Sequence, residues 1–132
     1  MLQGCLKQIK NGKKKLHIVN DKLGTPTYTH DFARNVILLI KKEYWGLYNM
    51  VCEDLTSRLE ISRELLKNLG LERQVKIIEV SSNYFKKEYF APRPDSERLI
   101  NKKLDLRGLN IMRNWKVTLK DYLENYYEDY IK

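Results

Sequence analysis

Two loop segments of the sequence hold the side chains best suited to bind a ligand. The first, residues 24–29, reads Gly-Thr-Pro-Thr-Tyr-Thr and places three hydroxyls and a phenol around a proline, directly before a predicted helix. Backbone amides at a helix start can bind an anion or a sugar. The alternative is a plain connection between a strand and a helix, with Thr29 as the N-cap.

The second segment, residues 91–96, reads Ala-Pro-Arg-Pro-Asp-Ser and holds Arg93 between two prolines. Prolines restrict the backbone, which lowers the entropy cost of directing a guanidinium group toward a phosphate. An ion pair between Arg93 and Asp95, or another neighbour, is the alternative. Spacing favours the two interpretations about equally.

Other kinds of site lack their residues. A dinucleotide-binding loop needs closely spaced glycines, whereas the six glycines here are scattered, and neither a Tyr-x-x-x-Lys nor a Gly-x-Ser-x-Gly motif occurs. The histidines and cysteines do not have the spacing of zinc ligands. Asp31 follows His30 but is explained by the dipole of the predicted helix. These patterns predict no catalytic residue, no cofactor-binding residue and no metal ligand in this chain.

Length and composition predict one domain, residues 1–132. Hydrophobic residues make up 42% of the chain and aromatic residues 11%, enough for one core. No apolar run approaches the roughly 20 residues that span a bilayer. The sequence lacks the pattern of a signal peptide, and its two cysteines, Cys5 and Cys52, fit a reducing compartment as buried thiols. We expect a cytoplasmic protein that does not associate with membranes.

The net charge of +8 is concentrated near the N-terminus. Residues 1–42 contain nine basic and two acidic side chains, and the densest part is the lysine run between Lys7 and Lys15. Stacking platforms usually accompany cations in a single-strand-binding surface, but no aromatic residue precedes Tyr28. A solvated helix end is therefore the favoured interpretation. A phosphate-attracting rim, or a nucleic-acid binder, is the weaker one.

The periodicity of the first half predicts a helix, a strand, a second helix and a second strand. The first helix covers residues 2–9 and the first strand residues 16–19. The second helix runs from the Thr29 cap to about residue 42, with a buried side listed as Phe32, Val36, Leu39 and Ile40. Residues 46–51 then have the pattern of a buried strand.

The second half continues the alternation of helices and strands. Thr56 or Ser57 caps a helix that stops at Gly70, and residues 75–80 form a strand. A short helical turn follows at residues 81–83, and residues 91–94 are extended. A long helix covers about residues 112–131, with an inward stripe listed as Trp115, Leu119, Tyr122, Leu123, Tyr126 and Tyr130. The fold class is mixed α/β, with a small mixed sheet and packed helices.

The order of these segments resembles the C-terminal part of the dTDP-4-dehydrorhamnose reductases, which are extended short-chain reductases. Residues 19–33 are similar to the family's Asp-Gln-x-Gly-Ser/Thr-Pro-Thr-Tyr segment and the helix after it, with Lys22 where Gln is usual. Residues 46–49 are similar to its Gly-x-Tyr-His strand. Residues 93–96 and 103–104 are similar to its Arg-Pro-x-x-Ser and Lys-Leu stretch. The resemblance spans nearly the whole chain.

The resemblance implies a reductase that uses NADPH or NADH to reduce the 4-keto group of dTDP-4-dehydro-L-rhamnose. This chain would supply the substrate-binding part. Its partner would be a Rossmann cofactor domain, to which no segment of this chain is similar. Thr27 and Tyr28 would line the dTDP-sugar pocket. Arg93 would face the diphosphate, and Ser96 belongs to the same binding stretch. The chain alone would be inactive.

A function of a different class stays open. The aromatic stripe on the last helix would be exposed in a fragment, which favours self-association. The alternative is therefore a non-catalytic interaction module that retains the fold and forms homo-oligomers.

Overall fold

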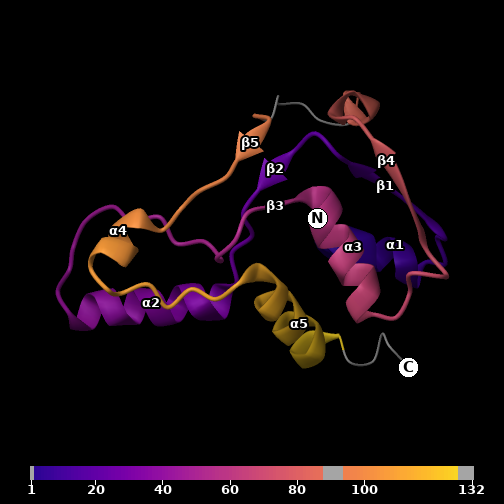
Figure 1. Cartoon of the computed structure of the whole chain (residues 1–132). Helices are drawn as coiled ribbons and strands as arrows, with labels where there is room; N and C mark the ends of the chain where they lie inside the picture. The colour runs from indigo at the N-terminus through magenta and orange to yellow at the C-terminus, as the bar shows by residue number, and fades with distance from the viewer. Residues whose placement is uncertain (1, 88–93, 128–132) are drawn as a thin grey trace.

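The computed structural model describes residues 2–87 and 94–127 and has a mixed α/β fold, as the sequence predicts (Figure 1). The helices are α1 (Leu2–Lys10), α2 (Thr29–Lys41), α3 (Arg58–Asn68), α4 (Lys102–Leu106) and α5 (Trp115–Tyr126), with a 3-10 turn η1 (Ser82–Phe85). The strands are β1 (Lys15–Val19), β2 (Leu23–Gly24), β3 (Thr56–Ser57), β4 (Lys76–Val80) and β5 (Ser96–Glu97).

The strands form two small sheets in place of the single sheet expected. β1 and β4 pair in parallel, with Lys15 opposite Lys76 and Val19 opposite Val80. In the other sheet β2 lies between β3, which is antiparallel to it, and β5, which is parallel to it. The second sheet is short, yet it brings the chain near residue 96 beside the loop that follows β2.

The main core lies between α1, α3, α5 and the β1–β4 pair. Leu6, Leu16, Leu65 and Leu123 are among its most buried side chains, and both cysteines are buried. α3 starts at the predicted Ser57 cap, whose side chain accepts from the Glu60 amide while Glu60 accepts from the Ser57 amide. The helix stops before Gly70, which has a φ of +65°. The Ser57 cap and Gly70 each act on the adjacent turn of the chain, and together they set the two ends of this helix.

The predicted buried face of α2 is wrong. Leu39 is buried, but Phe32 and Ile40 are exposed, and Val36 is only partly covered. The side chains that face the protein are Asp31, Asn35 and Leu39, spaced four residues apart. Two of these three side chains, Asp31 and Asn35, are polar. They form hydrogen bonds with the backbone of residues 109–113 instead of packing in an apolar core. Asn35 donates to the Leu109 carbonyl at 2.7 Å and accepts from the Ile111 amide at 3.1 Å.

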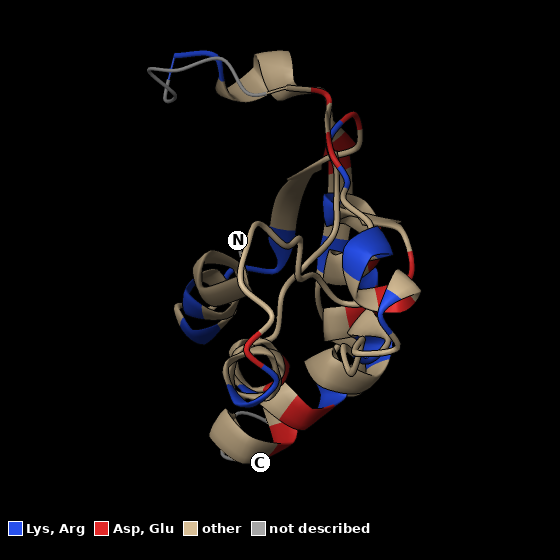
Figure 2. Ribbon diagram, turned by 90° about the vertical axis from the view of Figure 1, so that its left-hand side faces the viewer, with Lys and Arg blue, Asp and Glu red and all other residues tan. Residues whose placement is uncertain are grey.

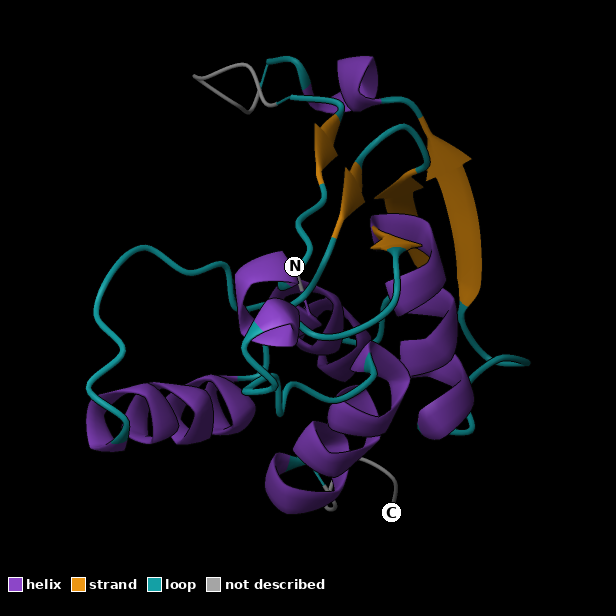
Figure 3. Cartoon of the chain, turned by 60° about the vertical axis from the view of Figure 1, so that its left-hand side comes forward, coloured by secondary structure: helices purple, strands orange, loops and turns teal. Residues whose placement is uncertain are grey.

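The buried strand predicted at residues 46–51 is absent. The segment arches around α4 as a loop (Figure 3), and only Val51 of these residues is buried. A strand needs a neighbouring strand, and none of the described residues supplies one here. Instead, Asn101 takes the place of a strand at Val51: it accepts from the Val51 amide at 2.9 Å and donates to the Val51 carbonyl at 2.7 Å.

The last helix is shorter than expected, and part of its stripe is core. α5 begins at Trp115 after an Asn114 cap, whereas the sequence predicted a start near residue 112. Trp115, Leu119 and Leu123 are buried in the main core, so they are not available for self-association. Tyr126 is exposed, and Tyr130 lies outside the described residues. α4 was not predicted.

The basic N-terminal region is exposed, as expected for a solvated helix end. Lys7 and Lys10 lie on α1, and Lys13, Lys14 and Lys15 lead into β1 with exposed side chains (Figure 2). No helix in the described part of the chain is long and apolar enough to cross a bilayer.

Candidate functional site

A cavity of about 190 Å³ lies where the 24–29 loop meets α5. Loop residues form one wall, α3 contributes Ile61, and the N-terminal end of α1 contributes Leu2. The full lining is Leu2, Pro26, Thr27, Tyr28, Thr29, Cys52, Ile61, Trp115, Thr118, Leu119 and Tyr122. Most of these side chains are apolar or aromatic. Typical ligand pockets are about 300–1,000 Å³. This cavity is smaller, so it accepts only part of such a ligand, about one ring.

Thr27 and Tyr28, two of the four predicted site residues, both lie in this wall. The loop is held by its neighbours: the Pro26 carbonyl accepts from the Cys52 amide at 2.9 Å, and Thr27 Oγ1 donates to the Met50 carbonyl at 3.5 Å. Tyr28 is buried and precedes α2 as its N-cap position. Thr29 is therefore the first helical residue and not the predicted cap.

Aromatic rings continue from Tyr28 to the end of α5. The His30 ring stacks on Tyr28 with centroids 5.0 Å apart, and His30 Nε2 lies 2.8 Å from the Tyr126 hydroxyl. Burial raises the pKa of Tyr28, and electrostatic interactions with Tyr126 and Asp121 raise it further. The phenol is therefore neutral at physiological pH and keeps its hydroxyl proton for donation.

An ion-pair cluster joins α2 to α5 beside the cavity. Asp31 is 1% exposed and accepts from Arg113 Nε at 2.9 Å and from the Arg113 amide at 3.3 Å. Arg113 also donates to Asp121 at 2.7 Å. Hydrogen bonds to Asp31 and then to Asp121 raise the pKa of Arg113, so the guanidinium stays charged. Asp31 thus has a specific cationic partner, which the helix-dipole interpretation missed.

One polar atom in the cavity wall has no partner. Trp115 is buried, and its indole Nε1 has no hydrogen-bond acceptor among the described residues. Buried polar groups are usually paired, because an unpaired donor has lost its water without replacement. An acceptor on a bound molecule or a water would satisfy it.

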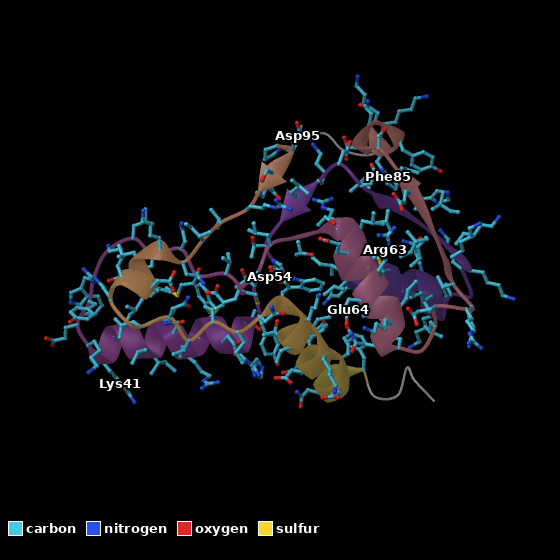
Figure 4. The ribbon with its side chains drawn as sticks, viewed as in Figure 1. Lys41, Asp54, Arg63, Glu64, Phe85 and Asp95 are labelled. Carbon is cyan, nitrogen blue, oxygen red and sulfur yellow. The ribbon has the colours of Figure 1, made fainter. Side chains whose placement is uncertain are left out.

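The other predicted site residues belong to the second loop. Ser96 lies in β5, opposite Leu23 of β2, and its hydroxyl accepts from the Arg98 amide at 3.4 Å. Ser96 does not line the cavity. Arg93 lies outside the described residues. Asp95, its suggested partner, pairs with Lys22 at 2.8 Å, and Figure 4 shows Asp95 above β2.

The sequence reasoning missed Arg113 and Asn35, whose partners lie 74 to 82 positions away. It also missed Asp121, which follows its partner Arg113 by eight positions. Asp31 and Arg113 are 82 positions apart, so their ion pair leaves no local signal in the sequence. In the part that the structure describes, no three His, Cys, Asp or Glu side chains are close enough to share a metal ion.

Comparison with known proteins places the chain in a family. Residues 2–128 match the RmlD substrate binding domain. The chain belongs to this family. It is 30% identical over 112 residues to the spore coat polysaccharide biosynthesis protein SpsK of Bacillus subtilis, covering 85% of this chain and 38% of that protein. It is 27% identical over 115 residues to a dTDP-4-dehydrorhamnose reductase of Mycobacterium tuberculosis, covering 86% of this chain and 37% of that protein.

Solved structures agree with the family match. The dTDP-4-dehydrorhamnose reductase of Clostridium acetobutylicum aligns with a TM-score of 0.84 and 29% identity, over 92% of this chain and 42% of that one. The corresponding Yersinia enterocolitica enzyme gives 0.82 and 26%, over 96% and 43%. A Bacillus anthracis reductase solved with NADP shares the fold at 21% identity, with a TM-score of 0.79 over 93% of this chain and 42% of that one. The chain thus spans about two fifths of the relatives that it matches.

Proposed function

We propose that this chain is the substrate-binding part of a dTDP-4-dehydrorhamnose reductase. Its ligand is a thymidine-diphosphate sugar whose 4-keto group is reduced with a hydride from NADPH or NADH. The observation that carries the proposal is that the most family-specific segment, residues 24–29, supplies one wall of the cavity. The family match over residues 2–128 supports it.

Each proposed binding residue has a physical role suited to that ligand. The cavity holds one ring of the ligand against Tyr28, while Thr27, an exposed residue of the cavity lining, bonds to its polar edge through the hydroxyl. Arg93 pairs with the diphosphate through a bidentate guanidinium contact, and the Ser96 hydroxyl donates to the same group. The rest of a nucleotide sugar exceeds the cavity and lies over the open loops.

The residues of this chain do not fit a dinucleotide cofactor. The six glycines are dispersed, and the cavity of about 190 Å³ is too small for two nucleotides. We therefore assign the cofactor, and the residues that protonate the product, to a separate Rossmann unit. This chain binds and orients the sugar nucleotide, and it is inactive by itself.

Calorimetry with dTDP-rhamnose tests the binding role. We expect saturable binding, weakened about tenfold or more by Arg93→Ala, because a charge-assisted hydrogen bond contributes about 1.5–3 kcal/mol. Arg98→Ala, a neighbouring exposed arginine on the same stretch, is the matched control and should leave binding unchanged. Tyr28→Leu, which empties one cavity wall, should also weaken binding.

Two results would contradict the proposal. One is a folded chain, with a cooperative thermal transition, that gives no heat with dTDP-rhamnose. The other is turnover of dTDP-4-dehydrorhamnose and NADPH by this purified chain alone, which would show that it contains the catalytic residues. We expect the chain to act in the cytoplasm, where its two unpaired, buried cysteines stay reduced.

A further inference from the structure

The outer side of the β1–β4 pair combines cations with aromatic rings. Side chains alternate along a strand, so Lys15 and His17 of β1 point away from the core, whereas Leu16 and Ile18 are buried. Lys76 of β4 lies opposite Lys15 in the register and is also exposed. Figure 1 shows α1 and α3 on one side of the two strands, and no α-helix of the described chain on the other. This outer side is therefore open to a ligand.

Lys15 and Lys76 form a like-charged pair across the two strands. Adjacent strands are about 4.8 Å apart, and like charges that face each other across a sheet destabilise it. Neither lysine forms an ion pair with a carboxylate of the described residues. Glu79 of β4 turns to the other side and pairs with Arg63 of α3 at 2.6 Å. An anion bound between the two lysines would offset their repulsion.

A stack of two rings lies farther along the same side of the strands. The His17 ring stacks on Tyr84 of η1, with centroids 5.1 Å apart and an angle of 11° between the planes. Phe85 packs edge-on against Tyr84 with centroids 4.9 Å apart, and Tyr84 is still 59% exposed. Its ring is thus held by neighbours and presented to solvent. Lys15 and His17 are two positions apart, or about 6.6 Å along the strand, so cation and ring lie close enough for one strand of nucleic acid to contact both.

Further cations continue this surface at both ends. Residues 13–14, which precede β1, and residues 86–87, which follow η1, are lysines with exposed side chains. Asp21 contacts the start of η1, but its carboxylate is occupied by hydrogen bonds from the Ser82 amide and hydroxyl, both at 2.9 Å. Lysines therefore flank the exposed ring along the chain on both sides.

We propose that this basic–aromatic surface, defined as Lys15, His17, Lys76 and Tyr84, binds single-stranded nucleic acid. Phosphates lie against the two lysines, and an unpaired base stacks on the exposed ring of Tyr84. Proteins that bind single strands combine a positively charged track with aromatic platforms in this way. The lysine run has no aromatic residue near it in the sequence, since Tyr84 reaches it from a distant part of the chain. The surface is a second site, because none of its four residues belongs to the cavity lining.

Fluorescence anisotropy tests the surface with the full chain and a labelled oligodeoxyadenylate of about 15 nucleotides, within the range of single-strand site sizes. We expect saturable binding at about 0.1 M salt. The logarithm of the association constant should fall with the logarithm of the salt concentration, with a slope of roughly −1.4 to −2.8 for two to four contacted phosphates. An abasic oligonucleotide of the same length keeps the phosphates but cannot stack, so it should bind at least about fivefold more weakly.

Variants separate the stacking contact from the phosphate contacts. Tyr84→Ala removes the platform and should weaken binding at least about fivefold while leaving the salt slope unchanged. Tyr84→Phe keeps the ring and should bind as the parent chain does. Lys15→Gln combined with Lys76→Gln should weaken binding and reduce the magnitude of the slope by about 1.4, as expected for the loss of two phosphate contacts.

Two control variants match these in charge and exposure. Lys41→Gln combined with Lys42→Gln removes the same net charge at the far end of α2, where Figure 4 labels Lys41. Tyr44→Ala removes a side chain that is 45% exposed. Screening acts over about 10 Å at 0.1 M salt, so both controls should bind within about twofold of the parent chain. All replaced side chains are exposed, so each variant should melt within about 3 °C of the parent, which shows that loss of binding is not loss of folding.

Several results would overturn the proposal. One is a folded chain that gives no saturable change in anisotropy at 0.1 M salt. Equal affinity for the abasic oligonucleotide, or full binding by Tyr84→Ala, would show cations without a stacking platform. Equal weakening by the control lysine variant would show attraction by net charge alone. Displacement of the oligonucleotide by dTDP-rhamnose would assign it to the proposed sugar site. Calorimetry with dTDP-rhamnose is a separate measurement, so failure of this surface and failure of the proposed function are distinguishable.

Discussion

Replacement of Asp31 by alanine tests whether the ion-pair cluster holds α2 and α5 together beside the cavity. The carboxylate of Asp31 is 1% exposed and receives the Arg113 amide and Nε, with the closest contact at 2.9 Å. Removal of one partner of a fully buried ion pair costs about 3–5 kcal/mol. The Arg113 side chain is 37% exposed and keeps Asp121, so solvent and that second carboxylate reduce the cost.

We expect Asp31→Ala to lower the free energy of unfolding by about 2–3 kcal/mol, on the scale of one or two charge-assisted hydrogen bonds. For a chain of this length that corresponds to a fall in melting temperature of roughly 10 °C. Urea unfolding followed by circular dichroism measures the free energy, and a thermal scan measures the midpoint. Asp31→Asn retains an oxygen acceptor and should lose less.

Asp121→Ala is the control for charge alone. Asp121 contacts the same guanidinium at 2.7 Å, but its side chain is 36% exposed, so its removal should cost no more than about 1 kcal/mol. The reasoning fails if Asp31→Ala destabilises the chain no more than Asp121→Ala does. It also fails if Asp31→Ala has the same effect in an Arg113→Ala background, because the two residues would then not be coupled.

Three further predictions concern separate features. Ser57→Ala removes the cap of α3 and should cost about 1 kcal/mol in urea unfolding, whereas an unchanged midpoint would mean that the capping box contributes nothing. Asn101→Ala leaves the amide and carbonyl of buried Val51 unpaired and should cost about 2–3 kcal/mol; a loss below that of Ser57→Ala would contradict the clamp. Burial raises the pKa of Tyr28 above its ordinary value of 10.0, so its contribution to stability is complete below that pH and is lost as the pH rises further. Thermal scans from about pH 8 to 11 should therefore show a shallower alkaline decline for Tyr28→Phe, and parallel curves would refute this linkage.

Features set by neighbouring residues were predictable from the sequence. The β1 and β4 strands, the Ser57 cap and the Gly70 stop depend on side chains and backbone preferences within a few positions. The loop at residues 24–29 was singled out for its hydroxyls, and it lies at the cavity. The sequence did not predict the cluster around Arg113, because Asp31 lies 82 positions before Arg113, although Asp121 is only eight positions after it.

The two largest errors share a physical cause. The sequence prediction assumed that the apolar side of α2 is covered by this chain and that the strand-like segment 46–51 has a strand beside it. Hydrophobic periodicity identifies which face is apolar, but not which polypeptide covers it. Here hydrogen bonds from Asn35 to residues 109–111 hold the other face of α2, and Asn101 substitutes for a strand at Val51.

These errors indicate how α2 is held in place beside the cavity. An isolated helix of 13 residues is marginal in water, so α2 depends on contacts for its stability. Besides the apolar contact of Leu39, its buried contacts are directional hydrogen bonds that Asp31 accepts and that Asn35 both donates and accepts, and these bonds fix the rotation of the helix about its axis. That rotation decides both where Tyr28 lies in the cavity wall and which side chains face outward. The same polar residues therefore set the geometry of the proposed sugar site.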